Sequence, residues 1–187
     1  MTQPDADFML HSGSAEKTVA VGRAVARCCE VGDIIGLDGE LGAGKTQFVR
    51  GLAQGLGLDP RQVSSPTFVM VQEYTPAGLD HLAAGIEPGH PATDPISPVL
   101  VHIDAYRLKN AGDLASIGWH DDGGELREGA VVAIEWASLI EPMLDPDLLR
   151  VQIEHDPEGR RISLSAKGKW RARMEVLREA LGKGLSS

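Results

Sequence analysis

The stretch Gly39-Glu40-Leu41-Gly42-Ala43-Gly44-Lys45-Thr46 fits the pattern G-x-x-x-x-G-K-[ST] at every fixed position, which is the pattern of a phosphate-binding P-loop. Its glycines let successive backbone N–H groups turn inward around a phosphate without Cβ clashes. Lys45 carries a compact positive charge suited to the β- and γ-phosphates, and Thr46 offers a hydroxyl to Mg²⁺, which takes few protein ligands. The stretch therefore predicts a nucleoside triphosphate site.

The residues on either side of this loop strengthen the prediction. The apolar run Asp33-Ile34-Ile35-Gly36-Leu37 before it has the length of a strand. After it, apolar residues recur at helical spacing from Phe48 to Leu56, and Gly57 stands where a helix would be capped. Strand, glycine loop and helix together aim the positive end of the helix dipole at the phosphates. In this setting, a glycine-rich turn that matches by chance is the weaker interpretation.

Length and charge limit the class of protein. With 187 residues, 42% of them hydrophobic and 24% charged, the chain predicts one globular domain, residues 1–187, with a mostly aliphatic core because only 4% are aromatic. The formal net charge of −9 argues against direct binding of DNA or tRNA, which needs lysine and arginine to displace counterions. Basic residues do gather at 160–161 and 167–173, where a solvated face is the preferred interpretation.

Neither cysteine content nor hydropathy points to an exported protein. Cys28 and Cys29 are adjacent and cannot easily bridge, and the six histidines share no zinc-ligand spacing with them. No apolar run approaches the ~20 residues of a membrane span, and residues 1–7 lack the features of a signal peptide. We expect a cytoplasmic protein that has no membrane partner.

The rest of the chain predicts an α/β fold. A first helix is expected over 14–29, a turn leading into a β-branched segment over 64–71, and a proline-rich flexible insertion over 76–98. The fully apolar runs 99–103 and 130–134 predict strands covered on both faces. Together they indicate a P-loop NTPase-like mixed, largely parallel sheet flanked by helices.

The C-terminal part of the chain has a different pattern. Apolar and polar residues alternate over 149–154 and 162–166 around the turn 156–159, which predicts an antiparallel hairpin with one exposed face. An amphipathic helix begins near Trp170 and is expected to stop at Gly182, leaving a disordered tail over 183–187.

Two acids complete the predicted site. Asp104 and Glu135 each follow an apolar strand, and P-loop enzymes place such an acid near Mg²⁺ and the attacking water. Each alone could equally be a solvating residue where a strand leaves the sheet. Thr67 follows a proline on a short turn, where it could sense a γ-phosphate or bond its own backbone. No guanine-recognising Asn-Lys-x-Asp sequence is present, which favours ATP.

Four motifs resemble one family. Gly39–Thr46, Ser65-Pro66-Thr67-Phe68 leading to Glu73-Tyr74, His102–Leu108 and Ile134-Glu135-Trp136 occur in the order and approximate spacing of the TsaE (YjeE) family. Members are small ATPases of bacterial tRNA threonylcarbamoyladenosine synthesis. The resemblance extends from the first helix to the hairpin at 159–161 and covers most of the chain.

The resemblance implies roles for individual residues. Lys45 and the P-loop amides would hold phosphates, and Thr46 and Glu135 would bind Mg²⁺. Asp104 would support hydrolysis near the metal, and Thr67 would lie in a switch-like loop. These roles are expectations carried over from the family.

Three further residues and two partners also follow from the resemblance. Trp136 would brace Glu135 or lie at a partner surface, unless it is a plain core aromatic, and Thr18 and Arg160 would reach the nucleotide. The family acts with the TsaD and TsaB proteins, so tRNA would be met only through that complex. The segment 76–98 is longer than the link expected in the family.

Two other functions remain open from the sequence. A stand-alone small-molecule kinase would need an arginine-bearing lid, for which Arg107 and Arg127 are the candidates, although neither lies in a recognisable lid segment. A docking module could instead bind nucleotide only as a switch. The motifs favour an ATPase that serves a larger modification complex.

Overall fold

The computed structural model describes residues 7–66, 69–76, 99–120 and 123–184. Thr67 and nearly all of the predicted insertion lie outside these residues. In the described part of the chain, no helix combines the length and the apolarity that crossing a bilayer requires.

The described residues form one seven-stranded sheet in the order β1-β7-β6-β2-β5-β4-β3. Its strands are β1 Phe8–Ser12, β2 Ile34–Asp38, β3 Val71–Tyr74, β4 Val99–Asp104, β5 Ala130–Glu135, β6 Leu148–Asp156 and β7 Gly159–Ala166. The central four strands β6, β2, β5 and β4 run parallel, whereas β1, β7 and β3 pair antiparallel at the two edges. The predicted α/β fold with its C-terminal hairpin is confirmed.

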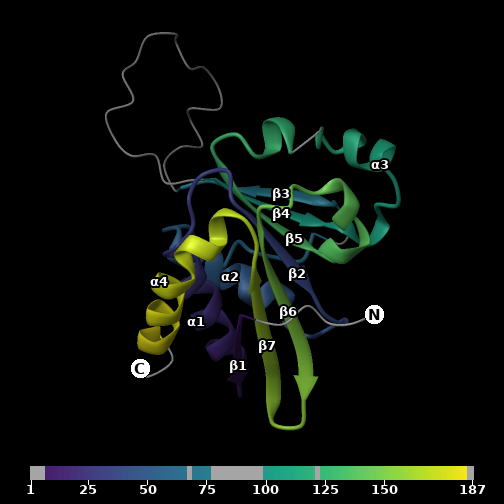
Figure 1. Ribbon diagram of the computed structural model, residues 1–187. Helices are drawn as coiled ribbons and strands as arrows, with labels where there is room; N and C mark the ends of the chain where they lie inside the picture. The colour runs from purple at the N-terminus through teal and green to yellow at the C-terminus, as the bar shows by residue number, and fades with distance from the viewer. Residues whose placement is uncertain (1–6, 67–68, 77–98, 121–122, 185–187) are drawn as a thin grey trace.

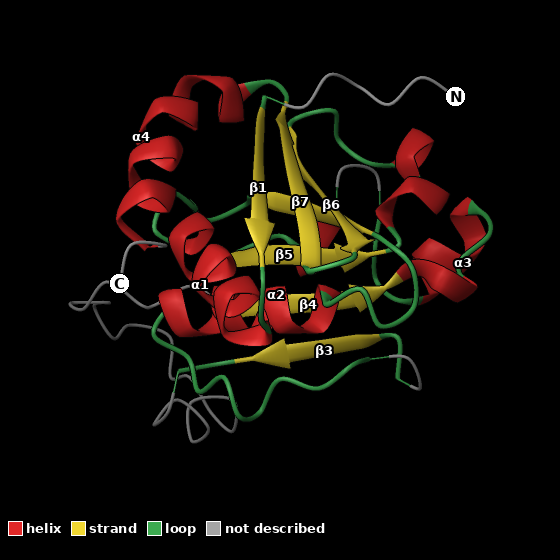
Figure 2. Ribbon diagram, turned by 90° about the horizontal axis from the view of Figure 1, so that it is seen from below, coloured by secondary structure: helices red, strands yellow, loops and turns green. Residues whose placement is uncertain are grey.

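Helices lie on both faces of this sheet. The α-helices are α1 Ala15–Ala26, α2 Lys45–Gly55, α3 Ala111–Ser116 and α4 Lys169–Gly184, and the short 3-10 segments are η1 Ala105–Arg107, η2 Gly124–Leu126, η3 Ala137–Leu139 and η4 Glu141–Met143. Figures 1 and 2 show α1, α2 and α4 gathered on one side, with α3 apart from them. The C-terminal ends of β2, β4 and β5 share one edge because these strands are parallel.

Two hydrophobic clusters explain why the central strands are apolar throughout. Val131 and Ala133 of β5 belong to the cluster that α1, α2 and α4 cover, whereas Val132 and Ile134 belong to the cluster on the α3 side. Successive strand residues point to opposite faces, so a strand covered on both faces needs apolar residues at nearly every position.

Helices α1 and α2 pack with unusually close backbones. A Cβ added to Gly22 of α1 would lie 2.1 Å from the carbonyl oxygen of Phe48, and one added to Gly51 of α2 would lie 2.1 Å from that of Val19. Only glycine therefore fits at this crossing. The close packing fixes α2, which follows the P-loop, against α1. Ser14 caps the N-terminus of α1.

Several predicted boundaries were wrong. Helix α1 ends at Ala26 rather than near Cys29, because the chain turns there toward β2, and α4 continues through Gly184 past the predicted stop at Gly182. The strand near 64–71 begins only at Val71, after a turn, and edge strand β1 was not predicted. The start of β3 depends on its pairing with β4, and β1 depends on its pairing with β7. Both partners are distant in the sequence.

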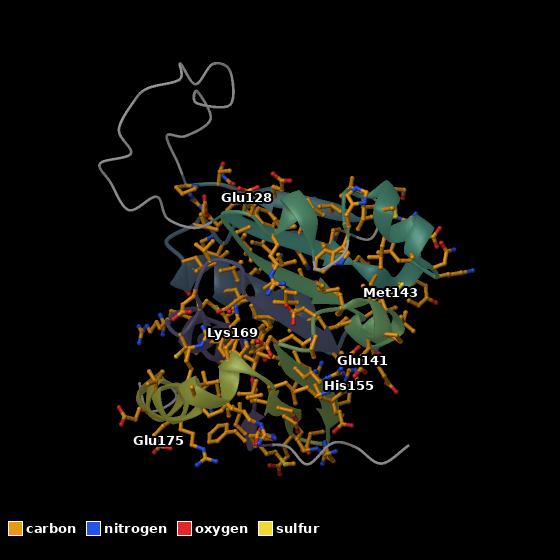
Figure 3. The ribbon with its side chains drawn as sticks, turned by 45° about the horizontal axis from the view of Figure 1, so that its top comes forward. Glu128, Glu141, Met143, His155, Lys169 and Glu175 are labelled. Carbon is orange, nitrogen blue, oxygen red and sulfur yellow. The ribbon has the colours of Figure 1, made fainter. Side chains whose placement is uncertain are left out.

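The basic segment 167–173 contributes to stability rather than forming only a solvated face. The Arg173 guanidinium donates to both oxygens of the buried Asp33 carboxylate at 2.6 and 2.9 Å, and Lys169 Nζ lies 2.9 Å from the same group. The backbone N–H of Glu30 adds a fourth contact at 2.7 Å. Figure 3 shows Lys169 at the start of α4, near the sheet. This cluster fixes α4 against the beginning of β2.

Replacing Arg173 with alanine should destabilise the fold by about 2 kcal/mol at pH 7. Breaking a buried ion pair typically costs about 3–5 kcal/mol, and here Lys169 and Glu30 still contact Asp33. Urea unfolding of Arg173→Ala beside Arg171→Ala, which removes an exposed arginine of the same helix, measures the difference. Equal midpoints for the two variants would contradict it.

The same contact predicts an acid dependence. Burial raises the pKa of Asp33, but the hydrogen bonds with Arg173, Glu30 and Lys169 more than offset this and hold that pKa below its ordinary value. The stabilisation is therefore complete above the unfolded-state pKa of about 3.9 and is lost as pH falls through the lower folded-state pKa. The stability difference between wild type and Arg173→Ala should shrink over that acidic range.

Candidate nucleotide-binding and hydrolysis site

The P-loop lies where β2 ends and α2 begins. Strand β2 stops at Asp38, and α2 starts at Lys45 with Gly44 as its N-cap in the left-handed region at φ 113°. No side chain of the described residues caps α2, and its first turn holds no acid. The N-terminal amides and the positive end of the helix dipole are therefore left for an anion.

Lys45 is held inside this loop. Its Nζ donates to the carbonyl oxygens of Gly39 at 2.7 Å and Glu40 at 3.1 Å, and it lies 3.8 Å from the centre of the Trp136 ring. Burial lowers the pKa of Lys45, and the nearby carboxylates of Glu135, Asp104 and Asp38 oppose that shift. The ammonium group is thus held by two backbone carbonyl oxygens and by the face of the Trp136 ring.

Thr46 and Glu135 meet beside this lysine. Thr46 Oγ1 donates to Glu135 Oε1 at 2.9 Å, although 89 residues separate the two in the chain. Burial raises the pKa of Glu135, but hydrogen bonds from His102 and Thr46 and the charge of Lys45 hold it below its ordinary value. Glu135 is therefore an ionised carboxylate at neutral pH, as a magnesium ligand must be.

Asp104 lies next to Glu135 across the sheet. The two residues are paired in the parallel register of β4 and β5, and they are 5% and 4% exposed. Asp104 Oδ1 also accepts a hydrogen bond from the backbone N–H of Tyr106 at 2.9 Å. Such burial argues against the interpretation of these acids as solvating residues at strand ends, since buried carboxylates are rare without a partner.

Arg160 and Thr18 both lie against the loop, but with their polar atoms engaged. Arg160 of β7 donates to the carbonyl oxygens of Ala43 at 2.9 Å and Gly42 at 3.2 Å. The Thr18 hydroxyl is bonded to Ser12 Oγ at 2.9 Å, while a Cβ on Gly44 would lie 3.7 Å from Thr18 Cγ2. Direct contact of either residue with nucleotide stays a prediction.

Trp136 contacts the site through Lys45. Its backbone is in the left-handed region at φ 61°. Its ring lies over Lys45 Nζ, and the centre of the ring is 5.3 Å from the centre of the Tyr106 ring. Its amide donates to the carbonyl oxygen of Leu37 in β2 at 2.8 Å. An unfavourable backbone conformation that the surroundings maintain is typical of functional sites.

His102 begins one of the four family motifs, but sequence reasoning gave it no role in the site. It is fully buried, and its Nε2 lies 3.0 Å from Glu135 Oε1. The sequence did hold a signal for this role. Residues two apart in a strand point to the same face, so His102 lies on the same face as Asp104.

The described residues contain no group of three or more His, Cys, Asp or Glu side chains that could hold a metal ion by themselves. The oxygens of Thr46, Glu135 and Asp104 nevertheless suit Mg²⁺, which binds one or two carboxylates and completes its shell with phosphate oxygens and water. The residues thus fit a magnesium ion that arrives with a nucleotide.

The kinase alternative receives no support from Arg127. Its Nε donates to the Gly32 carbonyl oxygen at 2.6 Å and its NH1 group to Asp145 at 2.8 Å. Gly32 precedes β2, whereas the P-loop follows it, so Arg127 lies at the opposite end of that strand.

Comparison with known proteins identifies the family. The sequence model described as "Threonylcarbamoyl adenosine biosynthesis protein TsaE" matches residues 12–162. This chain belongs to the TsaE family. A TsaE protein of Bacillus subtilis is 33% identical over 90% of this chain and 89% of its own length, and one of Streptomyces coelicolor is 36% identical over 72% and 76%.

A solved structure shares the TsaE-family fold. The crystal structure of YdiB from Bacillus subtilis covers 94% of this chain and 94% of its own, with a TM-score of 0.62 and 27% sequence identity. The family assignment places this chain in tRNA threonylcarbamoyladenosine biosynthesis. The predicted recognition of the family is confirmed.

Proposed function

We propose that this chain is a cytoplasmic Mg²⁺-dependent ATPase that acts with the TsaD and TsaB proteins and supports repeated threonylcarbamoyl transfer to tRNA. The observation that carries the proposal is the 2.9 Å contact between Thr46 of the P-loop and the ionised Glu135, beside the Lys45 ammonium group. A hydroxyl, a carboxylate and a lysine at a helix N-terminus are what a triphosphate and its magnesium require.

Each residue has a separate task in this proposal. Lys45 would turn from its carbonyl partners to the β- and γ-phosphates, and the α2 amides would bind their oxygens. Thr46 and Glu135 would hold Mg²⁺, which neutralises charge on the phosphates when bound. Asp104 would position the attacking water. Thr67, outside the described residues, is proposed to sense the γ-phosphate.

A hollow beside Glu40 is our candidate for the place of the rest of a nucleotide. An open hollow of about 330 Å³ lies between Glu40 and the end of β6, which is within the size range of small-molecule sites. Besides Glu40, its lining includes Gln152, Glu154 and His155 of β6 and Arg161 of β7.

Exposed apolar residues support a protein partner at this edge. Leu41 of the P-loop is 88% exposed, Tyr106 after β4 is 60% exposed and Leu139 after β5 is 50% exposed. All three follow the C-terminal ends of parallel strands. Apolar side chains grouped around a site are typical of a protein interface, and a net charge of −9 disfavours tRNA as the direct partner.

Reconstitution with purified TsaD, TsaB and tRNA tests the function. We expect slow ATP hydrolysis by the isolated chain, association with TsaD and TsaB that ATP strengthens, and several rounds of threonylcarbamoylation only when this chain is present. Association that persists without any hydrolysis would indicate a nucleotide-switched docking module instead. Tight tRNA binding by the isolated chain, or normal cycling without it, would contradict the proposal.

A further inference from the structure

One buried side chain contacts the proposed magnesium ligand Glu135 without being a predicted ligand itself. His102 of β4 is 0% exposed, and its Nε2 contacts Glu135 Oε1 at 3.0 Å. The same oxygen accepts the Thr46 hydroxyl at 2.9 Å. Within the described residues, Glu135 Oε2 makes no hydrogen bond, so the carboxylate is held by one oxygen only.

The chemistry of this contact defines which atom donates. An ionised carboxylate only accepts, so the proton between the two groups belongs to His102 Nε2. Nδ1 of His102 is buried without a hydrogen-bond partner among the described residues. Nε2 is therefore the ring nitrogen whose hydrogen is bonded, and it carries the contact with Glu135.

Packing alone does not explain a histidine here. Its register neighbour on β5 is Ala133, its partner on β3 is Gln72, and it shares a face with the fully buried Leu100. An apolar side chain would fill this place without burying a ring nitrogen, which costs free energy unless it is bonded. Among the described residues, the His102 side chain has a hydrogen bond only with Glu135.

We propose that His102 is a positioning residue: its Nε2–H fixes Glu135 Oε1 so that Oε2 faces the magnesium-bound nucleotide. This inference rests on the proposed function. Thr46 lies in the first turn of α2 and is itself a predicted metal ligand, so its hydroxyl would be shared between the metal and Glu135. His102 lies in strand β4 and is not a predicted ligand. Hydrogen bonds behind a metal ligand commonly change metal affinity or activity by 10–100-fold.

The variants separate a hydrogen bond from packing. His102→Phe keeps a ring but removes the donor, and His102→Gln restores an N–H near the position of Nε2. Tyr74→Phe is the matched control: its ring lies 6.4 Å from that of His102, and its hydroxyl bonds Ser64 and Gln72 but not Glu135.

The main readout is binding rather than turnover. Calorimetry measures ATP affinity in EDTA and across a Mg²⁺ series. For His102→Phe we expect ATP affinity in EDTA within about threefold of wild type, and a Mg²⁺ requirement raised about tenfold or more. His102→Gln should recover most of this loss, and Tyr74→Phe should match wild type.

A second comparison tests whether His102 acts through Glu135. In a Glu135→Ala background, His102→Phe should change the Mg²⁺ requirement little further, because coupled residues are non-additive. An unchanged Mg²⁺ requirement in His102→Phe, a His102→Gln variant as impaired as His102→Phe, or full additivity would each overturn the inference.

Two further comparisons distinguish failure of this inference from a variant that does not fold and from failure of the proposed function. If His102→Phe does not fold, His102→Gln is compared with His102→Asn, whose shorter side chain cannot reach Glu135, and equal Mg²⁺ requirements for the two would overturn the inference. If the wild-type chain neither binds nor hydrolyses ATP in the presence of Mg²⁺, the proposed function fails, which is a separate result.

Discussion

Lys45→Ala should weaken ATP binding by about 3 kcal/mol, or roughly a hundredfold. The substitution removes the P-loop's side-chain cation from beside a ligand with three or four negative charges. The contacts of Lys45 with the carbonyl oxygens of Gly39 and Glu40 do not add to this loss, because Lys45 would leave them to reach the phosphates in the wild-type complex. Calorimetry with ATP in the presence of Mg²⁺ measures the change.

Lys17→Ala provides the control for Lys45→Ala. Lys17 is an exposed lysine of α1, beside Thr18, and its removal changes the net charge of the protein equally. We expect its ATP affinity to stay within about twofold of wild type, since exposed charges are screened by solvent and salt. Near-equal ATP affinity in Lys45→Ala and wild type would exclude the P-loop as the nucleotide site.

Glu135→Ala should reduce ATP hydrolysis by about a hundredfold or more while leaving ATP binding in EDTA within about threefold. The α2 amides and Lys45 still hold the phosphates in this variant, but Mg²⁺ and the attacking water lose their positions. Phosphate release at saturating ATP and Mg²⁺, with calorimetry on the same protein, separates the two effects.

Two further variants sharpen the test of Glu135. Glu128→Ala removes an exposed acid just before β5, at the opposite end of the strand from Glu135, and should hydrolyse ATP at the wild-type rate. Asp104→Asn keeps an oxygen for the Tyr106 amide but removes the charge, so a comparable loss of hydrolysis would assign the effect to the carboxylate. Parental rates in both Glu135→Ala and Asp104→Asn would show that these acids do not serve catalysis.

Much of the site could be predicted because its parts are short and local. A P-loop needs glycines, a lysine and a hydroxyl at fixed spacing, and the helix it begins is visible in the spacing of apolar residues after Phe48. Asp104 and Glu135 could be predicted because each ends an apolar strand, and parallel strands bring their C-terminal ends to one edge.

The roles of the basic residues could not be predicted in the same way. Arg173 and Lys169 are indistinguishable in sequence from solvated helix residues, yet they hold the buried Asp33, 140 residues from Arg173 in the chain. Likewise, the Trp136 ring contacts Lys45 only because β2 and β5 are neighbours in the sheet. Pairings of this kind are decided by strand order and not by spacing along the chain.

The sequence by itself determined the phosphate-binding loop, the family and the α/β class, because each depends on residue types at short, fixed separations. Only the tertiary structure decided that Thr46 and His102 share one oxygen of Glu135, across 89 and 33 residues of chain. The physical reason is the sheet register, which sets His102 opposite Ala133 and Asp104 opposite Glu135. A shift of one residue would turn these side chains to the other face and dismantle the site.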